Sequence, residues 1–262
     1  MMNLNSMLKV IFLLVFSANL FAGTIIKTKS INTEFGEKIE TLETTYIQDG
    51  KLRIESSDEN GRSVTIIDSK NKIIINMDML DSSYVVITEE DFGRFAEMIN
   101  AKKNEMLAQF PEEQREAMRA MIEQQMEQVK NEPKIEYIKI KSENFNEYNC
   151  EVYKGIKMGE KVEELWITPW QNIELMNEYK KISLNLKKLF QKVADGLGEY
   201  GKLIEDEFDF EMIDKGFPVK TIEYEDGVAT TIETLEKVIQ KNLSPSLFKV
   251  PNGMIKKDFI EM

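Results

Sequence analysis

The run that most resembles a chemical motif is glycine-rich and spans Gly196 to Lys202, reading GLGEYGK. It matches the G-x-G-x-x-G pattern of dinucleotide-binding loops and most of a P-loop, both of which hold phosphate groups. In such loops the glycines follow a strand and open a helix that binds the phosphate, whereas a long predicted helix precedes them here. A P-loop also needs Ser or Thr after the lysine, where this chain has Leu203. The run therefore predicts a helix-ending turn, and we expect neither a nucleotide nor another cofactor to bind.

The supply of nucleophiles and general bases is narrow, because histidine is absent and Cys150 is the only cysteine. Ser/His and Cys/His nucleophilic schemes are therefore excluded, and so is the commonest zinc ligand. A single cysteine cannot form an intramolecular disulfide. Cys150 alternates with Tyr148 and Val152 and stands beside Glu151, a pattern that predicts a buried, unreactive thiol on a sheet face. We predict that the protein is not an enzyme.

An acidic segment late in the chain could supply oxygen ligands to calcium. Its members are Glu205, Asp206, Glu207, Asp209 and Glu211. The segment lacks the ligand spacing and central glycine of an EF-hand, and alternating Phe208 and Phe210 favour an amphipathic strand or edge with a solvated acidic face. The pair Glu163 and Glu164 points to opposite faces of a predicted strand, so these carboxylates cannot act on one bond. The sequence predicts no metal site.

Methionines gather in the middle of the chain and are the candidate ligand-binding residues. They are Met98, Met106, Met118, Met121 and Met126. Flexible thioether side chains fill irregular gaps in a core, and they also line surfaces that adapt to varied apolar partners. Two interpretations stay open: ordinary packing of the methionines onto a sheet, or a hydrophobic cover over an apolar cavity.

The chain is acidic, with 46 Asp and Glu against 34 Lys and Arg and a formal charge of −12. A surface of this sign repels nucleic acid and anionic lipid headgroups, so we expect no nucleic-acid partner. Solubility alone accounts for such a charge.

The first residues, Met1 to Ala22, follow the order of a cleavable signal peptide: a charge at Lys9, an apolar run, then small residues. The apolar run has about a dozen residues, whereas a membrane-spanning helix needs about twenty. Cleavage after Ala22 is the first choice and cleavage after Ala18 the alternative. No cysteine lies near either position, so we do not expect a lipoprotein. We expect a periplasmic or secreted protein.

Apolar and polar residues alternate from Thr24 to Thr88 between turn signals, which is typical of an antiparallel meander with one buried face. The dipeptides Asp49-Gly50 and Asn60-Gly61 readily adopt the positive φ angles of tight hairpin turns. Alternation resumes later, with a further hairpin around Asp226-Gly227. The predicted strands are Thr24–Thr33, Lys38–Ile47, Lys51–Glu55, Ser63–Ile67, Lys72–Asp78, Ser83–Thr88, Lys134–Lys141, Glu147–Lys154, Lys161–Thr168, Gly216–Tyr224 and Val228–Leu235.

Helical periodicity replaces the alternation between Glu89 and Asn131, where Pro111 separates two segments. This interval predicts a helical hairpin inserted into a β protein at about 89–131. An apolar stripe predicts a third helix from about Trp170 to Asp195. No repeat or low-complexity linker divides the chain, so we expect a signal peptide, residues 1–22, followed by one domain, residues 23–262.

Several short motifs are shared with one group of exported bacterial proteins. They include DGKLRI at residues 49–54, NCEVY at 149–153, ELWI at 164–167, GFPV at 216–219 and LFKVPNG at 247–253. Together with the signal peptide, they resemble an uncharacterised family of the LolA/LolB-like superfamily, which includes lipoprotein carriers and an RseB-like envelope-stress regulator. The chain departs from the resemblance in its 89–131 insertion and at Met254, where an aromatic residue is expected.

The resemblance implies an α+β fold: a curved, incompletely closed antiparallel sheet, a LolA-like half-barrel with helices on its concave side. It also implies a non-enzymatic periplasmic binding protein that holds an acyl chain, a lipid or a lipoprotein between the sheet and its helices. The alternative is an envelope protein-interaction or stress-sensing module of the same fold, with its concave face filled by its own side chains. Copurifying lipid would separate the two, because a filled core leaves no volume for a ligand.

Overall fold

The computed structural model describes residues 23–34, 37–58, 61–130, 133–173, 176–197 and 211–259. The predicted signal peptide and the turn position Asn60 lie outside these ranges. So do residues 198–210, which hold most of the glycine-rich run and of the acidic segment. Within the described residues, twelve strands form one sheet that three α-helices accompany.

Alternating side chains build the strands, because every second residue of a strand faces the same side of its sheet. The predicted strands are confirmed, with shifts at their ends. They are β1 Gly23–Glu34, β2 Glu37–Gln48, β3 Lys51–Asp58, β4 Gly61–Asp68, β5 Ile73–Asp78, β6 Ser83–Ile87, β7 Glu136–Phe145, β8 Tyr148–Lys157, β9 Glu160–Thr168, β10 Phe217–Glu225, β11 Val228–Lys241 and a short β12 Ile255–Lys256 that was not predicted.

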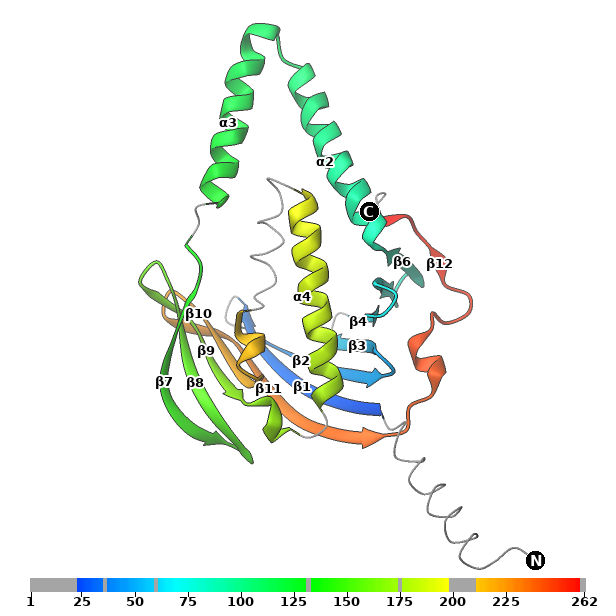
Figure 1. Cartoon of the computed structure of the whole chain (residues 1–262), viewed down its shortest axis with the longest axis vertical. Coiled ribbons are helices and arrows are strands. Elements are labelled where there is room, and N and C mark those ends of the chain that lie inside the picture. The colour runs from blue at the N-terminus through cyan, green and yellow to red at the C-terminus, as the bar shows by residue number, and fades with distance from the viewer. Residues whose placement is uncertain are drawn as a thin grey trace, which may run out of the picture.

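The sheet combines two meanders, in the order β12-β6-β5-β4-β3-β2-β1-β11-β10-β9-β8-β7. Strands β1 to β6 form the first meander, β7 to β11 form the second, and the pairing of β1 with β11 joins them. Every described pair is antiparallel except β12 with β6. Strands β7 and β12 are the two edges, so the sheet stays open, and Figure 1 shows its strong curvature. The fold is α+β, as predicted.

Two hairpin turns predicted from Asp-Gly dipeptides are confirmed. Asp49 and Gly50 have φ angles of 57° and 79°, and Asp226 and Gly227 have φ angles of 51° and 78°. Aspartate and glycine adopt this left-handed conformation more easily than other residues, and its twist suits the flanking strands. These turns therefore fix the register of the β2–β3 and β10–β11 hairpins.

The helices are α2 Glu89–Ala108, α3 Glu112–Lys130 and α4 Asn177–Leu197. A capping box starts α2, because the Thr88 hydroxyl accepts from the Asp91 N–H and the Asp91 carboxylate accepts from the Thr88 N–H. Pro111 precedes α3, and its carbonyl accepts from the N–H groups of Gln114 and Arg115. The predicted hairpin is thus confirmed, and Figure 1 shows α2 and α3 rising away from the sheet.

Helix α4 lies on the concave side of the sheet (Figure 1). Ile182 of this helix is 1% exposed, and it shares one core cluster with Ile47 and Leu52 of the first meander and Val219 of the second. Burial of each such side chain contributes about 1.5–3 kcal/mol. One helix therefore holds both halves of the sheet together.

The segment before α4 corrects the predicted start of that helix at Trp170. Trp170 begins a 3₁₀ turn, Trp170–Asn172, and α4 itself begins at Asn177. The Trp170 indole N–H donates to the Ile213 carbonyl at 2.7 Å, and its ring packs near Phe217. The apolar residues that suggested an earlier helix start are thus held by tertiary contacts rather than by a helical stripe.

The C-terminal segment covers the convex side of the first meander. Phe248 packs with Ile25, and the buried guanidinium of Arg53 donates to the Leu247 carbonyl at 2.9 Å. Arg53 also pairs with Glu55 at 2.7 Å, so its buried charge is compensated. The first meander is therefore buried on both faces, which its alternating pattern alone did not predict.

Candidate ligand-binding groove

A groove lies between α4 and the turn that joins β4 to β5, and we call it the α4 groove. Its volume of about 520 Å³ falls within the range of about 300–1,000 Å³ that is usual for small-molecule pockets. Both walls contribute to its apolar lining, which consists of Ile67, Ile73, Ile74, Leu186 and Leu189. Lysines dominate its polar lining, which consists of Asp68, Ser69, Lys70, Lys72, Asn185, Lys188 and Lys192.

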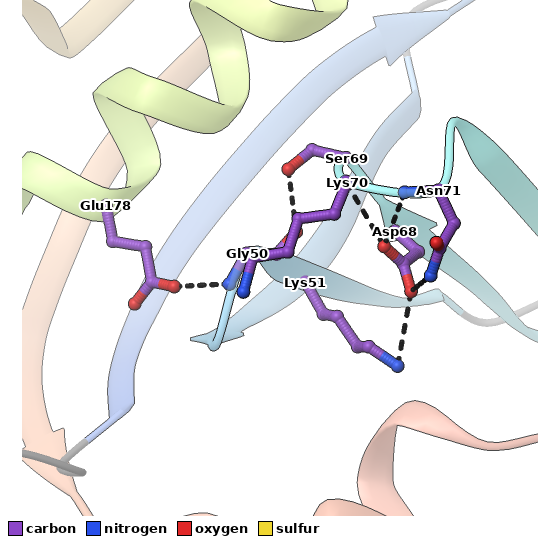
Figure 2. Close-up of polar contacts among 7 residues, drawn as sticks. All are labelled: Gly50, Lys51, Asp68, Ser69, Lys70, Asn71 and Glu178. Carbon is purple, nitrogen blue, oxygen red and sulfur yellow. Dashed lines mark hydrogen bonds and ion pairs between the residues drawn. The ribbon is translucent and has the colours of Figure 1, made fainter.

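The β4–β5 turn shapes one wall of the groove (Figure 2). The Asp68 carboxylate accepts from the N–H groups of Lys70 at 3.2 Å and Asn71 at 3.0 Å, and from Lys51 Nζ at 3.2 Å. Burial raises the pKa of Asp68, but the bonds from Asn71 and the charge of Lys51 outweigh it and leave the pKa below its ordinary value. Lys72 then adopts a φ of 55°, and β5 follows. The turn thus carries Lys70 and Lys72 on a fixed backbone.

A chain of hydrogen bonds ties α4 to this turn, as Figure 2 shows. The Glu178 carboxylate, in the first turn of α4, accepts from the Gly50 N–H at 2.5 Å. The Gly50 carbonyl accepts from the N–H and the hydroxyl of Ser69, at 3.1 and 2.7 Å. A Cβ atom at position 50 would come within 2.7 Å of Lys70 Cε, so glycine here also leaves room for the Lys70 side chain.

A carboxylate of the protein joins the two walls of the groove. Glu89, the first residue of α2, accepts a hydrogen bond from Lys192 of α4 and one of 2.6 Å from Lys72 of the turn. These two bonds, the one from Lys192 first, lower the pKa of Glu89 to about 2. Glu89 is therefore ionised at neutral pH and holds two of the four lysines of the groove.

The other two lysines, Lys70 and Lys188, have no ion-pair partner among the residues that the structure describes. Lys188 comes from α4 and Lys70 from the turn, so each wall supplies one of them. Lysine stems are apolar while the ammonium group stays in water, so such residues extend an apolar lining up to a charged rim. The α4 groove thus combines aliphatic walls with a cationic edge.

Aromatic residues fix the base of α2 beside the groove. Phe92 and Phe95 pack against Leu189 and Val193 of α4. The ring centroids of Phe92 and Phe190 lie 6.3 Å apart in an edge-to-face arrangement, which favours aromatic packing. Leu189 therefore contributes both to this contact and to the groove.

A second pocket, of about 100 Å³, lies under the first turns of α4, and we call it the carboxylate pocket. Glu43, Glu233 and Tyr179 line it together with apolar residues and threonines. Loss of water raises the pKa of Glu43, and loss of water followed by the charges of Glu43 and Glu223 raises the pKa of Glu233. Burial, reinforced by the charges of Glu43 and Glu233, raises the pKa of Tyr179 to about 12. The half-buried Glu43 carboxyl and Tyr179 hydroxyl are therefore favoured in their neutral, protonated forms.

Glu43→Gln is expected to stabilise the protein at neutral pH and to change little near pH 4. The folded protein binds the Glu43 proton more tightly than the unfolded chain, so this contribution to stability is full below the ordinary pKa and is lost as pH rises through the raised value. Glutamine fills the same space and stays neutral. Thermal melts from about pH 4 to about pH 8 would test this, with exposed Glu37→Gln on the same strand as the control. Parallel Tm curves for wild type and Glu43→Gln would contradict it.

Of the five methionines predicted to cover a ligand, the four whose side chains the structure describes do not line the α4 groove. The five are Met98 and Met106 in α2, and Met118, Met121 and Met126 in α3. Met106 lines a shallow depression between the two helices with Ile99 and Ile122. Met98 and Met118 are half-buried, Met106 and Met121 are exposed, and the Met126 side chain is outside the described part of the structure. Their role as a cover stays a prediction.

Cys150 is buried, and it packs with Val152 and Trp166 in the main core cluster. Burial raises the pKa of its thiol, which suits the predicted unreactive cysteine. Among the described residues, no group of three or more acidic, histidine or cysteine side chains could hold a metal ion. No helix in the described ranges is both long and apolar enough to cross a membrane.

The sequence predicted the apolar face of α4, but it did not identify that face or the lysines beside it as a binding site. Leu186 and Leu189 belong to the apolar stripe that predicted α4, and Lys188 and Lys192 flank that stripe at a spacing of one helical turn. This spacing is a usable signal for a cationic rim. The sequence gives no sign that Lys70 of a distant turn lies opposite the helix.

One known protein family matches a continuous stretch of the chain that contains most of these elements. A family described as a domain of unknown function, DUF4412, matches residues 88–254. The matched range begins at the capping Thr88 and includes the helical hairpin, α4 and the second meander. Among curated proteins, none matches the chain.

Solved structures with a partial likeness include an uncharacterized conserved protein from Thermus thermophilus. It is 11% identical, with a TM-score of 0.46, over 92% of this chain and 93% of that chain. PNGF-II is 12% identical, with a TM-score of 0.37, over 92% of this chain and 32% of its own length. A DUF1329 family protein from Desulfovibrio piger is 7% identical, with a TM-score of 0.20, over 90% and 93% of the two chains. Because the family match spans more than half of its residues, the chain belongs to the DUF4412 family.

Proposed function

We propose that this protein is a non-enzymatic binding protein for an acyl chain, carried by a lipid or a lipoprotein and held in the α4 groove. The observation that carries the proposal is the aliphatic lining of the groove, supplied by α4 and by the adjoining ends of β4 and β5. Concave sites with apolar walls and a few placed polar groups are the usual form of a small-ligand site. The groove also lies beside α4 rather than beneath it, so a chain can enter without displacing the core.

We further propose a LolA/LolB-like fold and a periplasmic location. The first rests on an open, curved antiparallel sheet with a helix on its concave side. The second rests on the order of charge, apolar run and small residues before Gly23. Both agree with a carrier that meets acyl chains in the cell envelope.

Native mass spectrometry of the protein recovered from a periplasmic fraction tests the location and the ligand together. The mass of the denatured chain should correspond to a start at Gly23, and the native mass should include a retained lipid. A protein found only in the cytoplasmic fraction, with its Met1 terminus intact, would contradict export. A lipid-free protein that also binds no apolar probe would contradict the binding function.

Ile73→Ser is expected to weaken binding of a neutral fluorescent probe, N-phenyl-1-naphthylamine, by about tenfold, because it removes apolar surface from the groove. Ile75→Ser is the matched control, since Ile75 lies on the same strand but packs against Val64 and Ile66 outside the groove. Both variants lose similar apolar area, so a general loss of stability would affect them alike. Equal probe affinities in the two variants would count against the groove as the site.

A second candidate function is an envelope protein-interaction module. Two observations favour it: side chains of the protein fill the space between α4 and the sheet, and the α2–α3 hairpin rises away from the sheet (Figure 1) with Met106 and Met121 exposed. Adaptable methionine surfaces suit variable protein partners. The probe titration separates the two candidates, because an interaction module needs no affinity for small apolar molecules.

A further inference from the structure

We propose that the ligand of the α4 groove is an anionic amphiphile whose carboxylate or phosphate head is bound by Lys70 and Lys188. This inference rests on the proposed function, because it names the class of the acyl ligand. It assigns the tail to the aliphatic lining and the head to the two lysines that lack an ion-pair partner among the described residues.

Glu89 shows how this groove holds an anion. Its carboxylate accepts hydrogen bonds from Lys72 on the turn and from Lys192 on α4, so one negative group is bound from both walls at once. Charge-assisted bonds of this kind are shorter and stronger than bonds between neutral groups. The walls are therefore spaced to let a single carboxylate bridge them.

Lys70 and Lys188 also come from opposite walls of the same groove. Lys188 precedes Lys192 by one turn of α4, and Lys70 precedes Lys72 in the β4–β5 turn. Each pair takes one lysine from each wall, but only the second pair has a carboxylate between its members in the described structure. The first pair thus offers a place for an anion that the protein itself does not supply.

The charge of the groove also selects against other head groups. The four lysines of the lining outnumber the acidic groups that meet them, Asp68 and Glu89, in a chain whose overall charge is −12. Asp68 is already engaged by Lys51 and by the turn N–H groups, so it does not neutralise the rim. A cationic head group would meet the ammonium groups of Lys70 and Lys188, which no carboxylate pairs with in the described structure, and a neutral head group would form no ion pair with them.

Displacement of N-phenyl-1-naphthylamine from the mature protein by four amphiphiles of equal chain length tests the head group. Laurate and dodecyl phosphate should bind about five- to tenfold tighter than dodecanol at low salt, and dodecyltrimethylammonium should bind more weakly than dodecanol. The preference should shrink at high salt, because these charges are exposed. Inorganic phosphate without a chain should displace nothing. If it competed as well as dodecyl phosphate, the site would be one for free anions and the proposal would be overturned.

The double variant Lys70→Gln with Lys188→Gln should abolish the preference and leave the affinity for dodecanol unchanged. The matched control is Lys27→Gln with Lys181→Gln, which removes two exposed lysines away from the groove and should keep the preference. Equal binding of charged and neutral amphiphiles by the wild type would overturn the head-group assignment but leave the acyl-binding function in place. Failure of every amphiphile to displace or replace the probe would instead overturn the proposed function.

Discussion

Gly216→Ala is expected to destabilise the protein by about 3 kcal/mol, near the upper end of the range for added atoms in a packed core. A Cβ atom at Gly216 would lie 2.1 Å from the Thr168 carbonyl oxygen and 2.9 Å from Ile167 Cγ2. The first of these neighbours is backbone of β9, and Thr168 is fully buried, so no flexible side chain can move aside. The clash would separate β10 from β9 at the point where Phe217 pairs with Thr168. Chemical denaturation of wild type and variant measures the difference directly.

Gly93→Ala serves as the control and should change stability in the opposite direction. Gly93 lies in α2, and a Cβ atom there would meet nothing within 4 Å. Alanine in a helix is more stable than glycine by about 0.5–1 kcal/mol, so this variant should gain that amount. If Gly216→Ala were as harmless as Gly93→Ala, the close approach of β9 and β10 at this point would be wrong.

The strands could be predicted from the sequence because alternation and turn residues act locally. Asp49-Gly50 and Asp226-Gly227 determine hairpin turns within a few residues, and the strands beside them follow the same period of two. The end of β11 could not be predicted in this way. The alternation weakens after Leu235, but β11 continues to Lys241 because β1 pairs with it as far as Gly23.

The short strand β12 could not be predicted from the sequence, for a related reason. Ile255 and Lys256 form a parallel pairing with Ser83 and Tyr84 of β6. Neither segment has a sequence pattern that indicates its pairing partner. Pairings between distant segments depend on the overall topology, which propensity and periodicity do not contain. The same limit applies to the segment around Trp170, where burial against Phe217 replaced the helical turn that was predicted.

The candidate site was only half predictable. The apolar face of α4, which includes Leu186 and Leu189, follows from its periodicity, but the sequence did not mark it as a binding site, and the methionines that were predicted as a cover lie on α2 and α3. A cluster of methionines indicates an adaptable apolar surface, but it does not indicate which other part of the protein that surface faces. The lysines of the groove come from two segments that meet only in the folded chain, and such an assembly cannot be inferred from spacing along the sequence.

The packing of α4 indicates whether a ligand would bind beneath this helix, in an internal cavity, or in the α4 groove. Ile182 and Met176 are 1% and 0% exposed, and they belong to one core cluster with residues of both meanders. A ligand between α4 and the sheet would have to displace these side chains, at a cost of about 1.5–3 kcal/mol for each one. A ligand in the α4 groove would displace neither of them, because Ile182 and Met176 are not among the residues that line it.

Ile182→Ala is therefore expected to lower the free energy of unfolding by about 2–5 kcal/mol, the range for large-to-small substitutions in a close-packed core. The cost should appear in one cooperative transition, since Ile182 belongs to a core cluster that includes residues of both meanders. Equilibrium denaturation followed by circular dichroism and by tryptophan fluorescence measures both features, because Trp166 and Trp170 lie in the same core cluster.

The matched control is Met121→Ala on α3, whose side chain is 47% exposed and should cost less than about 0.5 kcal/mol. A large loss of stability in Ile182→Ala, together with a small loss in Met121→Ala, would establish that α4 is part of the core and that the α2–α3 hairpin is peripheral. If Ile182→Ala were nearly neutral and bound more of an apolar probe than the wild type, α4 would be a loosely seated cover. The acyl chain would then belong beneath α4, as in the enclosed-ligand fold that the sequence motifs resemble, rather than in the α4 groove.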